Sequence, residues 1–372
     1  MKSNYRALSE LIEKVDERND DGAITELIGV SIDKCFIKSV ANTNGTDLSK
    51  YKIIRKNEFA VSLMQVSRDS KIPVARLEDY EVAIMSPAYP IFRVKDTRKI
   101  LPEYLDMWFK RPEFDREAAF IAVGGVRGSM PWEEFVKMKL PVPTIEKQLE
   151  IVNSYKAITE RIALKQKIND NLLDSVQAIF RSWFVDYDPF DGVFPSNWET
   201  GCVEDIAEFF DSMRKPLSSL ERTDMERIYP YYGAVSIVDY VDDYIFDGEY
   251  LLVSEDGIYV VDENGHPLIQ HISGKFWANN HAHILKGKSG FNEDSLYLFL
   301  ANTNMAPIVT GAAQPKINQA NLKSFPITIP DSETMLKFNN IIQPFFDQRL
   351  TNESEIKKLE ALQSLLLTRL VD

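Results

Sequence analysis

Cysteine is almost absent from this chain of 372 residues, which contains only Cys35 and Cys202. Two thiols are too few for a disulfide framework or a cysteine-rich zinc site, and we expect both to be reduced residues that pack inside the protein. No run of eighteen apolar residues is present either. The N-terminal segment MKSNYRALSELIEK is polar and predicts a helix rather than a targeting segment. We therefore expect a soluble, cytoplasmic protein that does not contact a membrane.

Sequence motifs of catalysis are also missing. The chain has no GxxxxGK phosphate loop, no Gly-x-Ser-x-Gly elbow and no Asn-Pro-Pro-aromatic or Asp-Pro-Pro-aromatic tetrapeptide. His281 and His283 come nearest to a metal-ligand pair, but no third ligand is close to them in the sequence. Because side chains alternate along a strand, we expect both imidazoles on one strand face, as polar residues of a binding surface. We predict a non-catalytic chain that binds no metal and no cofactor.

Positive charge is scarce in one half of the sequence. The formal net charge of −13 argues against a broad surface that coats nucleic acid, because phosphate contacts need Lys and Arg. Residues 1–143 carry 23 Lys and Arg against 22 Asp and Glu, whereas residues 186–330 carry 9 against 22. The second stretch alone therefore has a net charge of −13. The two halves differ in surface chemistry.

What the sequence does contain is one pattern that occurs twice, about 187 residues apart. Residues 124–143, GGVRGSMPWEEFVKMKLPVP, align without a gap to residues 311–330, GAAQPKINQANLKSFPITIP. Both blocks run from a loop of small residues, through a short amphipathic stretch, into an apolar strand closed by proline. The preceding segments SPAYPIF (86–92) and NHAHIL (280–285) correspond more weakly. Each half therefore contains its own globular part.

Each block is followed by a segment with apolar residues spaced alternately four and three apart, interrupted by polar residues. This spacing is typical of a helix that buries one stripe in a coiled coil. The apolar positions are Ile151, Tyr155, Ile158, Ile162, Leu172, Val176, Ile179 and Trp183, and then Phe338, Ile342, Phe345, Ile356, Leu359, Leu366 and Leu370. The polar positions are Lys165, Asn169, Arg349, Asn352 and Gln363.

Together these patterns predict an α+β protein with a pseudo-twofold internal repeat, in which two β-rich globular domains are separated by two long helices that form an antiparallel coiled coil. The predicted segments are a globular domain at 1–143, a central helix at 144–185, a second globular domain at 186–330 and a C-terminal helix at 331–372. A helix of about 40 residues is about 60 Å long and could act as a rigid spacer.

The loops before the two closing strands are the best candidates for contacting a ligand. In the first, glycines allow close approach of the backbone, and Arg127 could bind a phosphate or the O6/N7 edge of guanine. In the second, Gln314 could pair with an adenine edge and Lys316 with a phosphate. The alternative is an ordinary glycine-rich turn.

Further polar and basic residues surround these loops and are candidates for contacting DNA. In the first half the candidate set is Arg68, Lys71, Arg76, Arg93, Arg127 and Ser129. In the second half it is Lys215, Tyr232, Lys275, Asn280, His281, Gln314, Lys316 and Asn318. With so little positive charge, the second half would depend on hydrogen bonds and on a narrow basic strip.

Three segments point to a known family. Residues 171–190 (NLLDSVQAIFRSWFVDYDPF), 229–253 (YPYYGAVSIVDYVDDYIFDGEYLLV) and 310–318 (TGAAQPKIN) resemble the specificity subunit of Type I restriction-modification systems. The resemblance extends over essentially the whole chain, including the repeat of a globular module followed by a helix.

This resemblance implies a DNA-reading subunit without catalysis of its own. Each globular part would be a target-recognition domain for one half of a bipartite, asymmetric sequence in double-stranded DNA, and the helices would set the gap. Two methyltransferase subunits would dock on the helices, and restriction subunits with ATPase and nuclease activity would join them. S-adenosylmethionine, ATP and Mg²⁺ would be bound by those partners.

Two alternatives stay open at the level of sequence. One is the specificity subunit of another restriction system, in which methylation and cleavage share one partner chain. The other is a coiled-coil adaptor whose globular ends bind proteins, a reading supported by the acidic second half. The adaptor would bind no DNA even in the presence of partners.

Overall fold

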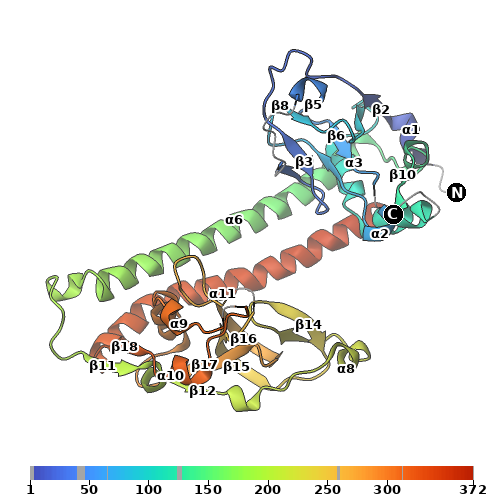
Figure 1. Cartoon of the computed structure of the whole chain (residues 1–372). Coiled ribbons are helices and arrows are strands. Elements are labelled where there is room, and N and C mark those ends of the chain that lie inside the picture. Colours follow the sequence, from blue (N-terminus) through green and yellow to red (C-terminus); the bar gives the residue numbers. More distant parts are fainter. Residues whose placement is uncertain are drawn as a thin grey trace. The chain divides into compact units, whose positions relative to one another are not determined.

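The structure is a computed structural model that describes residues 4–39, 47–64, 66–123, 128–257, 260–311 and 313–371 (Figure 1). The chain divides into two compact units. Unit 1 comprises Met1–Lys165 and Ser354–Asp372, and unit 2 comprises Gln166–Glu353. Each unit therefore holds one globular module and a portion of both long helices. The four-segment division expected from the sequence stays a prediction.

The module of unit 1 is built from short strands around one aromatic core. β1 (Tyr5–Ala7) pairs antiparallel with β10 (Lys139–Pro141). A four-stranded sheet has the order β2-β9-β6-β7, formed by Ile12–Val15, Ile91–Val94, Phe59–Val61 and Val74–Arg76. Two further antiparallel pairs join β3 (Ile28–Val30) to β4 (Phe36–Lys38) and β5 (Lys52–Arg55) to β8 (Val82–Met85). The helices are α1 (Leu8–Leu11), α2 (Val66–Asp69), α3 (Pro102–Phe109), α4 (Pro112–Ala122) and α5 (Trp132–Phe135).

The module of unit 2 has one large sheet. β11 (Glu199–Cys202) pairs antiparallel with β18 (Pro326–Ile329). A six-stranded sheet has the order β12-β17-β15-β16-β13-β14, formed by Ala207–Phe209, Ala282–Gly287, Phe246–Ser254, Ile269–Ala278, Tyr229–Tyr232 and Ile237–Val241. The helices are α7 (Val203–Ile206), α8 (Ser219–Thr223), α9 (Glu293–Ala301) and α10 (Gln319–Lys323), with a short 3₁₀ turn, η4, at Asp211–Met213.

The internal repeat is present in the order of the strands. β2-β9-β6-β7 in unit 1 corresponds to β12-β17-β15-β16 in unit 2, and all neighbours in both series are antiparallel. In both units the strand before the long helix pairs with the first strand of the module. Unit 2 adds β13 and β14 beyond the shared strands. The predicted fold class is confirmed at this level.

Two predictions for unit 1 were wrong. Cys35 is exposed, so it does not pack inside the protein as expected. The N-terminal segment was expected to be helical, but only Leu8–Leu11 form a helix, and the residues on either side form β1 and β2. The pairing of β1 with β10 and of β2 with β9 overrides the local helix propensity, because it buries Leu8, Leu11 and Ile12 in the core.

Aromatic residues fill the core of unit 1. Phe59 and Phe92 stack with their ring centroids 5.2 Å apart, and Phe109 meets both rings edge-on. These three side chains are completely buried. Burial of each contributes about 1.5–3 kcal/mol relative to exposure. The core of unit 2 surrounds Phe299 and Phe338 and includes residues of both long helices.

The two long helices are α6 (Ile145–Phe184) and α11 (Ser332–Thr368), coloured green and red in Figure 1. The start of α11 is capped by Asp331, whose carboxylate accepts from the backbone N–H groups of Glu333 and Thr334 at 3.1 Å each. None of the helices in the described residues combines the length and the apolar composition that a membrane crossing requires.

Within each unit the portions of α6 and α11 lie antiparallel. In unit 1, Thr159 accepts from Gln363 at 2.8 Å and Lys165 pairs with Glu355 at 2.7 Å. In unit 2, the Asn352 side chain donates to the Asn169 side chain at 2.8 Å. Of the polar positions of the predicted stripes, Asn169 and Asn352 therefore meet each other across the helix pair. Buried polar pairs of this kind fix the register of coiled coils.

We expect Asn352→Ala to lower the free energy of unfolding by about 1–3 kcal/mol, because it leaves the Asn169 amide without this partner in a partly buried site. Chemical denaturation of the full chain measures this loss. The exposed neighbour Thr351→Ala is the matched control. Equal effects of the two substitutions would argue against a role of the Asn169–Asn352 pair in holding the helices.

Candidate nucleic-acid interface

The loop at residues 310–318, which we call closing loop 2, is a tight turn with an exposed tip. Thr310 and Lys316 exchange two backbone hydrogen bonds of 2.8 Å. Gly311 has a φ of +85°, and a Cβ there would collide with the Gln314 carbonyl oxygen. Only glycine fits this turn. The Gln314 side chain is exposed at the tip.

The base of closing loop 2 is tied to the end of β15 and to the start of α10. The Ile317 N–H donates to the Glu255 carbonyl at 2.9 Å, and Lys316 forms a β-bridge with Asp256. The Asn318 side chain accepts from Asn321 N–H at 2.8 Å and thereby caps α10. The oxygen of Asn318, which we considered for DNA contact, thus has an intramolecular partner.

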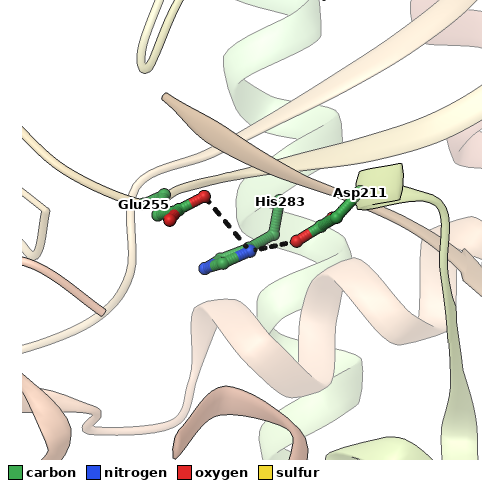
Figure 2. Close-up of side chains that lie close together, drawn as sticks. All are labelled: Asp211, Glu255 and His283. Carbon is green, nitrogen blue, oxygen red and sulfur yellow. Dashed lines mark hydrogen bonds and ion pairs between the residues drawn. The ribbon is translucent and has the colours of Figure 1, made fainter. Parts of the chain in front are cut away.

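A network of charged side chains, largely buried except for Lys316, lies at the base of closing loop 2, and Figure 2 shows its centre, Asp211, Glu255 and His283. His283 Nδ1 lies 2.6 Å from an Asp211 carboxylate oxygen and 3.7 Å from Glu255. Arg214 pairs with Glu255 at 2.6 Å and with Asp211 at 3.3 Å. Lys316 pairs with the second Glu255 oxygen at 2.9 Å. We call these five residues the anchor network.

Hydrogen bonds and positive charges keep both carboxylates of the anchor network ionised. Burial alone would raise the pKa of Asp211, but the hydrogen bond and charge of His283 outweigh it and lower that pKa. Burial would likewise raise the pKa of Glu255, and hydrogen bonds from Arg214 and Lys316 lower it instead. Both carboxylates therefore act as anions inside the protein.

Asp211, Glu255 and His283 form the one set of at least three potential metal ligands that converges within the described ranges, with donor atoms within 4.8 Å of one another. The Arg214 guanidinium and the Lys316 ammonium already balance the two carboxylates. A metal ion would have to displace Arg214, which also donates to the Ala282 carbonyl at 2.6 Å. We assign no metal to this group.

His281 and His283 do not share a face, contrary to the prediction. The His283 side chain is fully buried. The His281 side chain is 48% exposed, and its Nδ1 pairs with Asp256 at 2.6 Å. β17 begins only at Ala282, so the alternation of a strand does not extend back to His281. His281 stays a candidate for a surface contact, and His283 does not.

Other candidates in unit 2 are placed against aromatic rings. The Lys275 ammonium lies 4.3 Å from the centroid of the Tyr244 ring, and Lys215 lies 6.0 Å from that of Trp277. The half-buried Tyr232 ring packs against the core, and Asn280 is exposed. Of the eight candidates in this unit, Asn280, His281 and Lys316 are joined by contacts to Arg214, Glu255 and Asp256.

The corresponding loop of unit 1, closing loop 1, comprises residues 124–130. Residues 124–127 lie outside the described residues, and Arg127 is one of them. At the described end, Gly128 has a φ of +72°, and a Cβ there would collide with Ser67 Oγ. The Met130 N–H donates to the Leu63 carbonyl at 2.8 Å. Closing loop 1, with the half-buried Ser129, therefore ends against the start of α2.

The four basic candidates of unit 1 that the structure describes, which exclude Arg127, have acidic partners. Arg68 pairs with Asp69 at 2.7 Å, Arg93 with Glu13 at 2.7 Å and Lys71 with Asp33 at 3.8 Å, and all three cations are exposed. The Arg76 side chain is only 11% exposed and pairs with Glu78 and Glu103. Arg76 also lines a hollow of about 470 Å³ between β7, α3 and α6. It is placed to hold unit 1 together rather than to contact DNA.

The sequence reasoning did not select Asp211, Glu255 or Asp256. The sequence did contain a signal for Glu255 and Asp256, which directly follow the apolar run of β15. Burial of two carboxylates at a strand end costs free energy unless they have partners, so partners could have been expected. Apart from Arg214, which lies close to Asp211 in sequence, the partners come from segments 25 or more residues away. Their convergence could not be read from spacing.

The chain matches a known family in its second half. Residues 195–362 match the family described as the Type I restriction modification DNA specificity domain. This part of the chain is similar to that specificity domain. All five residues of the anchor network and all of closing loop 2 fall inside the matched residues.

Proteins similar to this chain carry a related designation. A Haemophilus influenzae protein named as a type I restriction enzyme specificity subunit is 39% identical over 128 residues, which are 34% of this chain and 32% of that protein. The MjaIX specificity subunit of Methanocaldococcus jannaschii is 22% identical over 297 residues, 73% of this chain and 68% of that protein. The first match thus spans about a third of the relative's length.

A solved structure with the same fold is the S subunit of a Type-I restriction-modification system from M. genitalium. It superposes with a TM-score of 0.60 at 14% identity, covering 99% of this chain and 96% of that chain. At this level of identity the likeness is one of fold.

A second buried acidic group of unit 2 lies at the start of α9. Asp294, in the first turn of α9, is 4% exposed and lies 3.5 Å from His271. Burial, followed by the negative charge of Glu249 and two further carboxylates, raises the pKa of Asp294 to about 7. Burial lowers the pKa of His271 to about 4, so its ring is neutral at pH 7 and does not offset the Asp294 charge.

We expect Asp294→Asn to stabilise unit 2 above pH 7. The folded-state pKa lies above the unfolded value of 3.8, so the stability contributed by the protonated carboxyl is fully present below about pH 4 and lost as pH rises to about 7. The substitution removes this loss, on the order of 4 kcal/mol at pH 8, because each of the roughly three pKa units corresponds to about 1.4 kcal/mol. Thermal melting from pH 4 to pH 8 measures it. Exposed Asp224→Asn is the control, and a gain that does not grow with pH would contradict the assignment.

Proposed function

We propose that this chain is the DNA-recognition subunit of a Type I restriction-modification complex and that each module reads one half of a bipartite target. One observation carries the proposal. The same strand order and the same closing-loop attachment occur twice, with different side chains on the two loops. Two modules that share a fold but present different side chains are suited to recognise the two different halves of an asymmetric DNA sequence.

The long helices are suited to fix the gap between the two half-sequences. α6 has 40 residues and α11 has 37, and portions of both belong to each unit. At about 1.5 Å per residue, a helix of this length extends over more than one turn of DNA, because major-groove faces recur about every 34 Å.

Partner subunits complete the proposed complex. Exposed leucines on the long helices, among them Leu164 and Leu336 at 59% and 62% exposure, offer apolar surface on which methyltransferase subunits could dock. These partners would bind S-adenosylmethionine, and restriction subunits would bind ATP and Mg²⁺. Because residues 186–330 have a net charge of −13, we infer that the partners supply much of the phosphate contact.

Coexpression with the methyltransferase encoded next to this chain tests the proposal. Sequencing that detects methylated adenine in host DNA is expected to reveal a two-part motif with a fixed internal gap. A soluble complex that deposits no new methylation would instead favour a protein-binding adaptor.

Single substitutions in the two closing loops should separate the half-sequences. We expect Arg127→Ala to relax the bases accepted in one half and Gln314→Ala to relax those in the other, each by about 10-fold to 100-fold in discrimination. The methylation motif of each complex measures this. A uniform loss across both halves would identify the two side chains as general phosphate contacts.

A change of helix length should alter the gap alone. Insertion of seven helical residues into both α6 and α11 adds about 10 Å to each and is expected to lengthen the tolerated gap by about three base pairs. The half-sequences should stay the same. Altered half-sequences in the methylation motif would show that modules and helices do not divide the work in this way.

A further inference from the structure

The surroundings of His283 select one protonation state of its ring. Nδ1 faces an Asp211 carboxylate oxygen at 2.6 Å, and Nε2 faces the Ile317 carbonyl oxygen at 2.8 Å. Both of these groups are acceptors, so both ring nitrogens must donate. Asp211 also accepts from Arg214 and from the Ile284 N–H at 2.9 Å, as an ionised carboxylate does. The ring that satisfies every partner is the imidazolium.

The charges around this ring come from three further segments. Asp211 and Arg214 belong to η4 and the residue after it, Glu255 follows β15, and Lys316 belongs to closing loop 2. Two carboxylates thus face three cations in a region where His283 is completely buried. Buried ions are tolerated only when paired in this way, and removal of one member leaves the others uncompensated.

The anchor network fixes both backbone polar groups of one loop residue. The Ile317 carbonyl accepts from His283, and the Ile317 N–H donates to the Glu255 carbonyl at 2.9 Å. The Ile317 side chain is itself fully buried. Ile317 lies between Lys316 and Asn318, so its orientation sets the direction in which closing loop 2 leaves the sheet.

Unit 1 holds its closing loop without such charges. The strand registers Phe59↔Phe92 and Leu251↔Leu285 place Leu63 at the position of Glu255 and Pro90 at that of His283. The equivalent backbone bond, from Met130 to Leu63, is present, and Met130 packs in the apolar core. Among the residues that the structure describes, the ionic anchor is therefore a feature of unit 2.

We propose that His283, as a buried imidazolium, is a positioning residue that holds closing loop 2 in the orientation used to read the second half-sequence. The last clause rests on the proposed function, whereas the ionic state and the loop anchoring do not. His283 would not touch DNA itself. It acts through Ile317 and through the ion pairs of Glu255 with Arg214 and Lys316.

The ring state is tested first, on the unmodified full chain. With ¹⁵N-labelled histidine, only four residues contribute signals. We expect both ring nitrogens of His283 to carry a proton at pH 7, with the signal assigned by its loss in His283→Gln. A His283 ring with one unprotonated nitrogen would overturn the proposal. The measurement is made on the unmodified chain, and the His283→Gln variant serves only to assign the signal.

Anchoring is tested by hydrogen exchange of the backbone amides at 310–318. A glutamine at 283 has one donor end and one acceptor end, so it cannot donate to both Asp211 and Ile317. We expect His283→Gln to increase exchange in this loop by about tenfold while the β15–β16 pairing stays protected. His266→Gln, which changes a histidine in the exposed Asp262 turn, is the control. If His283→Gln does not fold, Asp211→Asn provides the same test. Unchanged exchange in the loop would contradict the proposal.

Reading is tested last, in the complex with the methyltransferase. We expect His283→Gln to relax the second half-sequence by about tenfold and to leave the first unchanged. Equal loss in both halves would contradict a positioning role. The ring and exchange measurements need neither DNA nor partner. They decide the inference even if the wild-type complex deposits no methylation, which would contradict the proposed function instead.

Discussion

The antiparallel pairing of first and last strand is the constraint on which each module depends. β1 pairs with β10 and β11 with β18, and in both cases the long helix starts within a few residues of the paired strand. The pairing brings segments more than 120 residues apart in sequence to one place. The helix therefore leaves each module from a fixed point. The sheet and the loops of each module lie in the sequence between its first and last strands.

On this shared scaffold, the two modules stabilise the same attachment by different means. A backbone hydrogen bond from Met130 reaches Leu63, two positions after β6, and one from Ile317 reaches Glu255, directly after β15. In unit 1 the bond lies beside apolar side chains, and in unit 2 it lies beside five charged ones. Apolar packing tolerates changes of shape, whereas an ionic network requires every member. The second loop should thus be held more specifically than the first.

Sequence reasoning succeeded where the pattern is periodic or repeated. The four-three spacing predicted both long helices, with three of their four ends within one residue and the C-terminal end of α11 four residues too late. The repeat of small-residue loop, short helix and closing strand corresponds to α5-β10 and α10-β18. It failed at the N-terminus, because strand pairing with residues far along the chain decides the fold of residues 5–15. It also treated cations as free to bind DNA, although Arg76 and Lys316 have carboxylate partners that sequence spacing does not reveal. Arg127 lies outside the described residues.

The border between unit 1 and unit 2 lies inside the two long helices, and this position affects how related genes could exchange modules. Unit 2 is one uninterrupted stretch, Gln166–Glu353, inserted into the sequence of unit 1. The cross-helix contacts respect its borders, since Lys165 and Glu355 both belong to unit 1, and Asn169 and Asn352 both belong to unit 2. A genetic crossover at these two borders would transfer a whole module together with its own polar helix contacts. Recombination between related genes could in this way replace one half of the molecule without disturbing the other.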